Sequence, residues 1–318
     1  MQANMKLAGI EIGGTKLQLC IADASGEILH CLRYSILPSG GAEPIKKQIL
    51  DGLMELKGFD AVGKIGIGFG GPVDWNTGVI KTSHQVSGWA EFPFTEWLEK
   101  ATGKSVVMDN DANVAALGEA TQGKGKGFNR VFYITIGSGI GGGLVIDGKI
   151  YHGQVPGEME IGHVRLDKNG TTLESTCSGW AVDEQIQSFI SKNSQSLLAE
   201  LSRSHSKPFA NLLAPALDQH DEHAKMIISS VVDNLSFGLS HVVHLLHPDI
   251  IVVGGGLSLL GNYLLHPLRL QLPKYVMEAF HPVPCIELSA IGEQAVPLGA
   301  IELAKSIVKE QTKTANIQ

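Results

Sequence analysis

Cysteine is scarce in this chain, and its scarcity argues against a fold held together by disulfides. The 318 residues include four cysteines, at positions 20, 31, 177 and 285, and none of them belongs to a Cys-x-x-Cys pair. Cys20 and Cys31 stand in apolar runs, so we interpret them as buried free thiols. This pattern is typical of a protein of the reducing cytoplasm.

Long hydrophobic runs and excess positive charge are missing as well. No apolar run approaches the ~20 residues that cross a membrane, and the first residues lack the regions of a signal peptide. The 25 lysines and arginines are outnumbered by 32 aspartates and glutamates, which gives a net charge of −7. A general nucleic-acid binder needs a basic face, so we expect neither nucleic acid nor a membrane as a partner.

Two common phosphate-binding motifs are also absent. The chain has no G-x-x-x-x-G-K-[ST] sequence, and its glycine turns lead into strands rather than into the helix of a dinucleotide-binding fold. A nucleotide ligand is still compatible with the sequence, because backbone amides and Mg²⁺ can neutralise phosphates locally.

Glycine, by contrast, is abundant: 38 of 318 residues, or about 12% against a typical ~7%. Two stretches read as strand, glycine turn, strand, with apolar runs at 7–12 and 16–22 and again at 131–136 and 143–146. This repeat predicts a duplicated fold that grips a polyphosphate from both sides. The predicted phosphate-binding residues are Gly13, Gly14, Thr15, Lys16, Gly137, Ser138 and Gly139. Plain hairpins with no ligand are the alternative, and Gly254, Gly255 and Gly256 after the buried strand 250–253 weigh against it.

The remaining periodicity predicts an α/β protein of two domains. We expect a small α/β domain over 1–112, completed by a C-terminal helix over about 299–318, and a larger α/β domain over 113–298. Helices are predicted at 44–57, 94–102, 113–122 and 224–246. Residues 191–224 are polar and irregular, and form either helices with loops or a surface insertion.

The segment 107–113, Val-Met-Asp-Asn-Asp-Ala-Asn, ends one predicted strand and opens a helix. Asn110 or Asp111 could simply cap that helix. Capping accounts for one polar residue, however, and not for four within five positions. A carboxylate at the end of a strand beside a phosphate site suits a general base that accepts a proton from an attacking hydroxyl, so we predict this role for Asp111.

Three further polar residues each have more than one interpretation. Glu11 precedes the first glycine turn and is either a ligand of Mg²⁺ or a solvated acid. Glu160 and His163 lie in a glycine-rich segment in which acids alternate with apolar residues, as in an edge strand, and in which such residues can also bind sugar hydroxyls or a metal. Taken alone, His163 is more readily a hydrogen-bonded structural histidine than a ligand.

Taken together, these motifs resemble those of the bacterial ROK sugar kinases (repressor, open reading frame, kinase), over essentially the whole chain. The matching segments are Glu11–Lys16, Gly70–Asp74, Asn110–Asn113, Ile136–Gly143, Glu160–His163 and Val253–Gly256. The resemblance implies an actin-like, hexokinase-like (ribonuclease H-like) duplicated α/β fold with a cleft between two domains. It also implies a cytoplasmic enzyme, a homodimer, that uses ATP and Mg²⁺ on a small-molecule hexose.

The resemblance also assigns residues and a reaction. Asp111 corresponds to the catalytic base, Gly254–Gly256 would lie against the adenosine, and the sugar-binding residues would be Asn110, Glu160, His163 and Glu184. The implied reaction transfers the γ-phosphoryl group of ATP to a hexose, first of all to O6 of glucose. The alternatives are N-acetylhexosamine, mannose or fructose kinases, polyphosphate as the donor, a sugar-independent ATPase or acyl-activating relative, and a sugar-sensing regulator lacking its DNA-binding domain.

The chain departs from the family pattern at three places. Glu11 stands where Asp is usual, and Gln85 where Asn is common. The zinc-binding cysteines are reduced to Cys177, with Val182 at a ligand position. We therefore expect no structural zinc, and we expect packing around Trp180 to hold the His163 loop instead.

Overall fold

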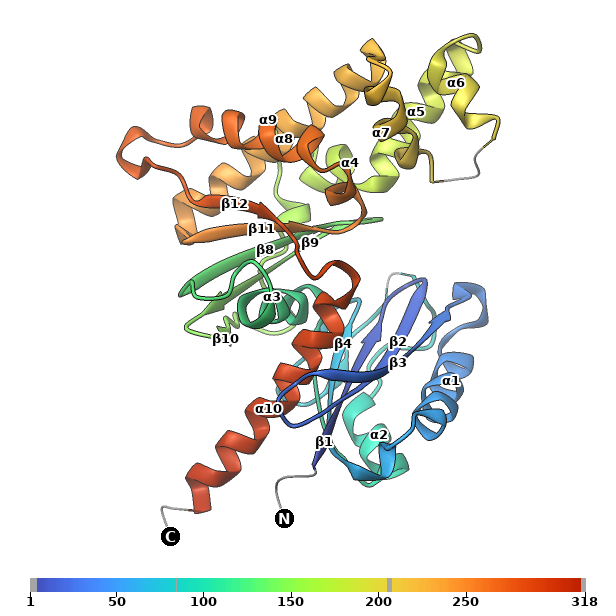
Figure 1. Cartoon of the computed structure of the whole chain (residues 1–318), viewed down its shortest axis with the longest axis vertical. Helices are drawn as coiled ribbons and strands as arrows, with labels where there is room; N and C mark the ends of the chain where they lie inside the picture. Colours follow the sequence, from blue (N-terminus) through green and yellow to red (C-terminus); the bar gives the residue numbers. More distant parts are fainter. Residues whose placement is uncertain (1–4, 84, 205–207, 316–318) are drawn as a thin grey trace. The chain divides into compact units, whose positions relative to one another are not determined.

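The computed structural model describes residues 5–83, 85–204 and 208–315 (Figure 1). The chain forms two compact units. The first consists of Met1–Asn129, Gly143–Glu158 and Glu293–Gln318, and the second of Arg130–Gly142 and Met159–Gly292. The domain boundaries at residues 112 and 298 that the sequence suggests stay predictions. The last residues of the predicted C-terminal helix, 316–318, lie outside the described residues.

A five-stranded sheet forms the centre of the first unit, in the order β3-β2-β1-β4-β7. Its strands are β1 (Lys6–Ile12), β2 (Lys16–Ala22), β3 (Ile28–Ser35), β4 (Val62–Phe69) and β7 (Ser105–Asn110). β1 and β2 form the antiparallel hairpin that the first glycine turn predicts, while β1, β4 and β7 are parallel. A small hairpin of β5 (Val73–Asp74) and β6 (Val79–Ile80) follows β4.

Helices cover both faces of this sheet (Figure 1). On one face lie α1 (Ala42–Glu55) and α2 (Phe94–Thr102), and on the other α3 (Asp111–Gln122) and α10 (Ala295–Ala315). Successive side chains of β1 point to opposite faces of the sheet, so this strand contributes to the packing on both sides. Ile10 belongs to the larger core cluster on the α1 side, whereas Leu7 packs with Ile301 and Ala304 of α10.

Glycine allows α10 to lie directly on the sheet. A Cβ atom at Gly66 of β4 would stand 1.8 Å from the carbonyl oxygen of Ala300, and one at Gly9 of β1 would stand 2.6 Å from that of Pro297. Any side chain at these positions would push the helix away from the strands, so two residues without side chains set the depth of this interface.

The second sheet repeats the first, in the order β10-β9-β8-β11-β12. Its strands are β8 (Arg130–Ile136), β9 (Ile140–Ile146), β10 (Lys149–Ile150), β11 (Ile250–Gly254) and β12 (Cys285–Leu288). β11 runs parallel to β8 and β12, as β4 does to β1 and β7. The duplication that the two glycine turns predict is thereby confirmed.

The helices of the second unit are α4 (Leu173–Cys177), α5 (Gly179–Lys192), α6 (Leu197–Ser202), α7 (Leu213–Asp218), α8 (Glu222–Leu246) and α9 (Asn262–Gln271). The irregular region 191–224 thus contains short helices, with residues 205–207 outside the described part. Among the described helices, α8 alone has the length and apolar composition to cross a membrane. However, 56% of its most apolar stretch is buried, as in the core helix of a globular unit.

Short 3-10 helices complete the chain: η1 (Pro38–Gly40), η2 (Phe59–Ala61), η3 (Ile161–His163), η4 (Phe209–Leu212), η5 (Gly256–Leu260), η6 (Leu272–Tyr275), η7 (Glu278–Phe280) and η8 (Gly292–Gln294).

The interpretation of Cys20 and Cys31 as free thiols is wrong. β2 and β3 are antiparallel neighbours, and their register sets the two cysteines opposite one another with Cα atoms 4.1 Å apart. The two sulfur atoms form a disulfide. Cys20 is buried as expected, but β3 is an edge strand and Cys31 is exposed. The pairing follows from the strand register, which the spacing of the two cysteines does not reveal.

Candidate active site

Three strand ends of the first unit meet at Gly70. Its backbone N–H donates to the carbonyl oxygen of Ile12 over 2.8 Å, which joins the end of β4 to the end of β1. A Cβ atom at Gly70 would lie 3.2 Å from Asp111 Oδ2 and 3.4 Å from the Cα atom of Gly13. The predicted base and the first glycine turn therefore lie side by side, at the carboxyl edge of the parallel strands where α/β folds bind ligands.

The first glycine turn is a tight hairpin with an exposed tip. The Gly13 N–H donates to the Lys16 carbonyl over 2.8 Å and closes the turn, and Thr15 at its tip is exposed. Gly14 lies against the side-chain amide of Gln85, so closely that a Cβ atom would overlap it. Gln85, one of the departures from the family pattern, is thus a neighbour of this turn.

Glu11 is buried beneath the same turn, with 7% of its surface exposed. Its Oε1 lies 2.9 Å from Lys16 Nζ, and its Oε2 accepts a hydrogen bond of 2.5 Å from Gln18 Nε2. Burial raises the pKa of Glu11, and the positive charge of Lys16 opposes the rise. The interpretation as a solvated acid does not hold. Both oxygens are engaged, so Mg²⁺ at Glu11 would bind through water or displace Lys16; its role as a metal ligand stays a prediction.

Asn110, rather than Asp111, caps helix α3. Asn110 Oδ1 accepts from the backbone N–H of Ala112 over 2.9 Å and, more weakly, from that of Asn113. Its Nδ2 donates to the Gly71 carbonyl over 3.2 Å. Because the cap is supplied by Asn110, helix capping does not account for Asp111, the first residue of α3.

A polar cluster lies directly behind this junction. Asp109, His152 and Glu158 each place a ligand-type atom within 4.8 Å of the others. In the described part of the chain they form the one such group of three, and a carboxylate–imidazole set of this kind could hold a transition metal. His152 Nε2 lies 2.7 Å from Asp109 Oδ2, and Asn113 Nδ2 donates to both Asp109 and Glu158.

The second glycine turn, in the second unit, connects β8 and β9. The Gly137 N–H donates to the Gly139 carbonyl over 2.9 Å, and Ser138 is exposed at the tip. The Gly137 carbonyl accepts from the N–H of Gly179, the first residue of α5, over 2.7 Å. The amino terminus of α5, capped by Ser178, therefore lies beside this turn. A helix end of this kind favours anions.

The third glycine segment lies against the same turn. Gly255 has a φ of +81°, and a Cβ atom there would stand 2.5 Å from backbone atoms of Ile136. Only glycine tolerates this conformation and approach at once. Gly254–Gly256 and Gly137–Gly139 therefore sit together at the carboxyl ends of the parallel strands β8 and β11.

Two of the predicted sugar-binding residues flank η3. Glu160 precedes this turn and His163 ends it, and both are exposed. A Cβ atom at Gly162 would lie 2.3 Å from the Ile140 carbonyl, so η3 packs on the first residue of β9, immediately after the glycine turn. This places Glu160 and His163 in the same part of the second unit as Gly137–Gly139.

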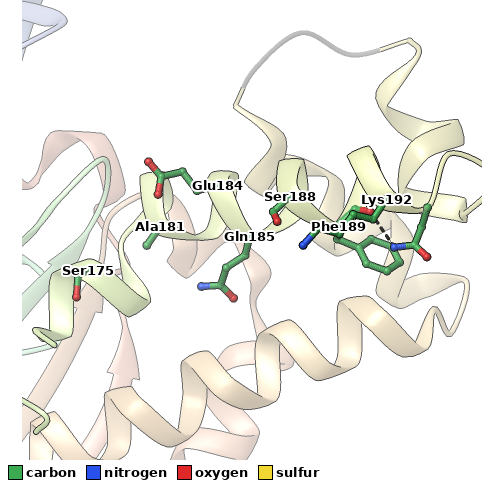
Figure 2. A pocket seen from close by; sticks show the side chains of 8 residues that line it. Ser175, Ala181, Glu184, Gln185, Ser188, Phe189 and Lys192 are labelled. Atoms are coloured by element: carbon green, nitrogen blue, oxygen red, sulfur yellow. Dashed lines mark hydrogen bonds between the residues drawn. The ribbon is translucent and has the colours of Figure 1, made fainter. Parts of the chain in front are cut away.

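Glu184 lies on α5 and lines a groove of about 500 Å³. Figure 2 shows Glu184, Gln185, Ser188 and Lys192 spaced along the helix, with Phe189 toward its far end. Neither Glu160 nor His163 lines this groove. The structure therefore does not join Glu184 to them by a shared cavity, and its role stays a prediction.

The remnant of the zinc motif does not fit a zinc ligand set. Cys177 is fully buried in α4, its Sγ lies 3.5 Å from the Val231 carbonyl, and burial raises its pKa to about 11. A zinc ligand must be a thiolate, so this environment opposes metal binding. The expected packing role of Trp180 is wrong, because 59% of this side chain is exposed on the first turn of α5.

The sequence did not predict some of the residues that hydrogen-bond near the two glycine turns. Glu174 accepts a hydrogen bond of 2.7 Å from the backbone N–H of Ile140 and so fixes the exit of the second turn. Asp109 and His152 support the Asn110–Asp111 junction. Asp109 stood within the polar segment 107–113, but no local pattern connects it with a histidine 43 residues away.

Comparison with known proteins gives one consistent family. The ROK family model matches residues 7–307. Glucokinase of Thermotoga maritima is 33% identical over 96% of this chain and 98% of its own. A putative xylose repressor of a Caldicellulosiruptor species is 26% identical over 94% of this chain and 78% of its own. A ROK glucokinase of Streptomyces griseus, solved with glucose and AMPPNP, is 28% identical, with a TM-score of 0.82 over 95% of this chain and 99% of that one.

Proposed function

We propose that this chain, which belongs to the ROK family and has its actin-like, hexokinase-like fold, is a sugar kinase that transfers the γ-phosphoryl group of ATP to O6 of glucose. Relatives named glucokinase, and a relative solved with glucose and a nucleotide analogue, support this choice of substrate and donor.

The main support for the proposal is that Asp111 and the first glycine turn both lie next to Gly70. Phosphoryl transfer needs an acceptor hydroxyl, a base within hydrogen-bond reach of it and a held polyphosphate. The carboxylate of Asp111 and the backbone of Gly13 lie within a few ångströms of one glycine. A plain hairpin would not require a carboxylate there.

The backbone at the turns fits a polyphosphate. A Cβ atom at Gly137 or at Gly256 would meet nothing within 4 Å, so open space borders the peptide groups at both places. A phosphate can therefore approach the backbone closely at both glycines, while the Gly137 N–H itself closes the turn on the Gly139 carbonyl. Lys16 beside Glu11 adds a positive charge at the first turn, and Mg²⁺ would supply charge neutralisation on the phosphates.

In the proposed reaction Asp111 accepts the proton of the sugar hydroxyl. Asn110, Glu160, His163 and Glu184 orient the sugar by hydrogen bonds. Of these, Asn110 already donates its side-chain amide to Gly71, which fixes its direction. A fixed donor loses less conformational entropy on binding than a mobile one.

A coupled assay tests the proposal with glucose, mannose, fructose, N-acetylglucosamine and N-acetylmannosamine, each with ATP and with polyphosphate. We expect the highest kcat/KM with glucose and ATP. Preference for another hexose would correct the substrate alone. ATP turnover independent of any sugar would replace the proposal by an ATPase, and sugar binding without turnover would replace it by a sugar-sensing regulator.

A further inference from the structure

The carboxylate of Asp109 ties the last strand of the first sheet to the helix that begins with Asp111. Asp109 is 2% exposed. Its Oδ1 accepts from the backbone N–H of Asn110 over 2.7 Å and from Asn113 Nδ2 over 3.0 Å. One buried oxygen thus holds both the final residue of β7 and a side chain of the first turn of α3.

His152 holds the other oxygen. Its Nε2 lies 2.7 Å from Asp109 Oδ2, and because an ionised carboxylate only accepts, the imidazole N–H donates. The imidazole is stacked on Trp75, with ring centroids 3.8 Å apart and planes 16° apart. Trp75 therefore sets the plane of the ring, and the ring sets the direction of the carboxylate.

Glu158 completes the group, which we name the Asp109 network: Trp75, Asp109, Asn113, His152 and Glu158. Glu158 Oε1 accepts from Asn113 Nδ2 over 2.5 Å, and its Oε2 accepts from the Gly153 N–H over 3.0 Å. Asn113 is 4% exposed, and among the described residues its Oδ1 has no hydrogen-bond partner. Its amide group is thus turned so that Nδ2 faces both carboxylates.

The network fixes the junction that carries the proposed base. Asn110 is held at three points: its N–H by Asp109, its Oδ1 by the first turn of α3 and its Nδ2 by Gly71. Only the first of these depends on a side chain that itself needs orienting. Without the His152 donor, the Asp109 carboxylate can rotate and release the Asn110 N–H.

We propose that His152 and Asp109 are positioning residues that hold Asn110 and Asp111 in their working geometry. The inference rests on the proposed function, because positioning matters for catalysis only if Asp111 is the base. Misplacing a reacting group by about 1 Å costs on the order of 10²-fold in rate. Residues that only orient Asn110 and Asp111 can therefore have a large effect on catalysis.

A metal at Asp109, His152 and Glu158 is the competing explanation of the same cluster. The atoms that would bind it are engaged with each other or with amides, and the 2.7 Å between Nε2 and Oδ2 is a hydrogen-bond length. The hydrogen-bonded network therefore accounts for the contacts without an ion.

Three variants test the proposal. His152→Leu removes the donor at similar volume, and His152→Gln keeps an amide N–H near the position of Nε2. His30→Gln makes the matched change at an exposed residue of β3. The measurements are hydrogen–deuterium exchange over residues 105–122, melting temperature, kcat and KM for sugar and for ATP, and metal content of the purified proteins.

For His152→Leu we expect faster exchange confined to the β7–α3 junction, a kcat lower by roughly 10- to 100-fold and a KM for ATP within about twofold of the parent. His152→Gln should recover most of the loss, and His30→Gln should match the parent. A purely structural histidine would lower the melting temperature and leave kcat per folded molecule unchanged, which would overturn the proposal.

Two other results would also overturn it: His152→Gln as impaired as His152→Leu, or one equivalent of zinc in the parent that His152→Leu loses. If the parent phosphorylates no sugar, the proposed function fails by itself. Exchange over residues 105–122 then still decides whether His152 holds the junction.

Discussion

At the scale of single residues, the structure assigns the helix cap and the predicted general base to two different residues. Asn110 and Asp111 were both candidates for the cap of α3, and the cap belongs to Asn110. Asp111 comes to lie next to Gly70, where the first glycine turn also arrives. An acid that does not cap the helix and lies beside a predicted phosphate site fits the proposed catalytic role.

Replacing Asp111 by Asn should remove the base while keeping the shape of the site. We expect kcat to fall by roughly 10²–10⁴-fold, because general-base catalysis contributes about that much. Sugar affinity, measured by calorimetry, should change little. Asp60→Asn, the same substitution at an exposed residue of η2, serves as the control. A turnover close to that of the parent would remove Asp111 from this role.

The four cysteines should differ in their reaction with iodoacetamide at pH 8 without reductant. Cys285 is exposed and should be modified. Cys177 should be protected, because burial and a pKa of about 11 leave very little thiolate at that pH. Cys20 and Cys31 should be found joined in one peptide pair. Peptide mass spectrometry measures the modification of all four cysteines. Rapid modification of Cys177 in the native protein would contradict its burial.

The same thiol gives the folding equilibrium a dependence on alkaline pH. Burial raises the pKa of Cys177 from 9.0 to about 11, so the folded state keeps the proton that the unfolded state loses first. The contribution of this group to stability is complete below about pH 9 and is lost as pH rises toward 11. Cys177→Ala should therefore flatten the fall of the melting temperature between those pH values, relative to the parent protein.

Some residues could not be placed from sequence because their surroundings come from distant parts of the chain. Trp180 is a large aromatic residue and was expected to pack, yet it stands on the exposed side of the first turn of α5. The role of His152 depends on Asp109 and Trp75, which lie 43 and 77 positions earlier in the chain. Motifs locate groups that act through neighbours in sequence, and they miss groups that act through neighbours in space.

At the scale of elements, glycine turns and apolar runs predicted most of the framework. The runs 7–12, 16–22 and 131–136 are strands, and the helix expected at 94–102 has those bounds. These elements depend on local periodicity, which a sequence displays directly. The division of 191–224 into α6, η4 and α7 could not be foreseen, because polar segments with short helices are decided by packing.

Close packing of α10 on the first sheet leads to a prediction at this scale. Gly66→Ala should destabilise the first unit, because the added methyl group would overlap the backbone of Ala300. Overpacking costs about 1–3 kcal/mol, which corresponds to a melting temperature lower by roughly 2–12 °C. Gly40→Ala is the matched control, since a Cβ atom there stands 3.4 Å from its nearest neighbour. If Gly66→Ala melted at the same temperature as the parent protein, α10 would have to shift away from the sheet at little cost, which would contradict this prediction.

At the scale of the whole molecule, two sheets share one strand order, and each carries a glycine turn after its first strand. The repeat of the sequence is thus a repeat of topology. The order of the strands could be expected once the duplication was recognised. Among the described residues the disulfide joins two strands of the first sheet, and the Asp109 network joins residues at the end of β7 to residues that follow β10, so the repeat itself does not indicate either of them.

Assembly into a homodimer is the prediction that belongs to this scale. Large apolar side chains of the second unit are exposed, among them Leu245 at 81% and Leu259 at 84%. Such exposed apolar side chains are candidates for the contact between subunits. Light scattering should give twice the chain mass of 33.9 kDa, and Leu245→Glu should reduce the measured mass. A mass of one chain at micromolar concentration would contradict the dimer.

The bridge between β2 and β3 has a practical consequence for work on this protein. Samples prepared with and without dithiothreitol would differ by two hydrogen atoms per chain, and only the oxidised form would carry the bond between Cys20 and Cys31. Activity, melting and exchange experiments should therefore be run on material whose intact mass has been checked, so that a variant is never compared with a parent of another oxidation state.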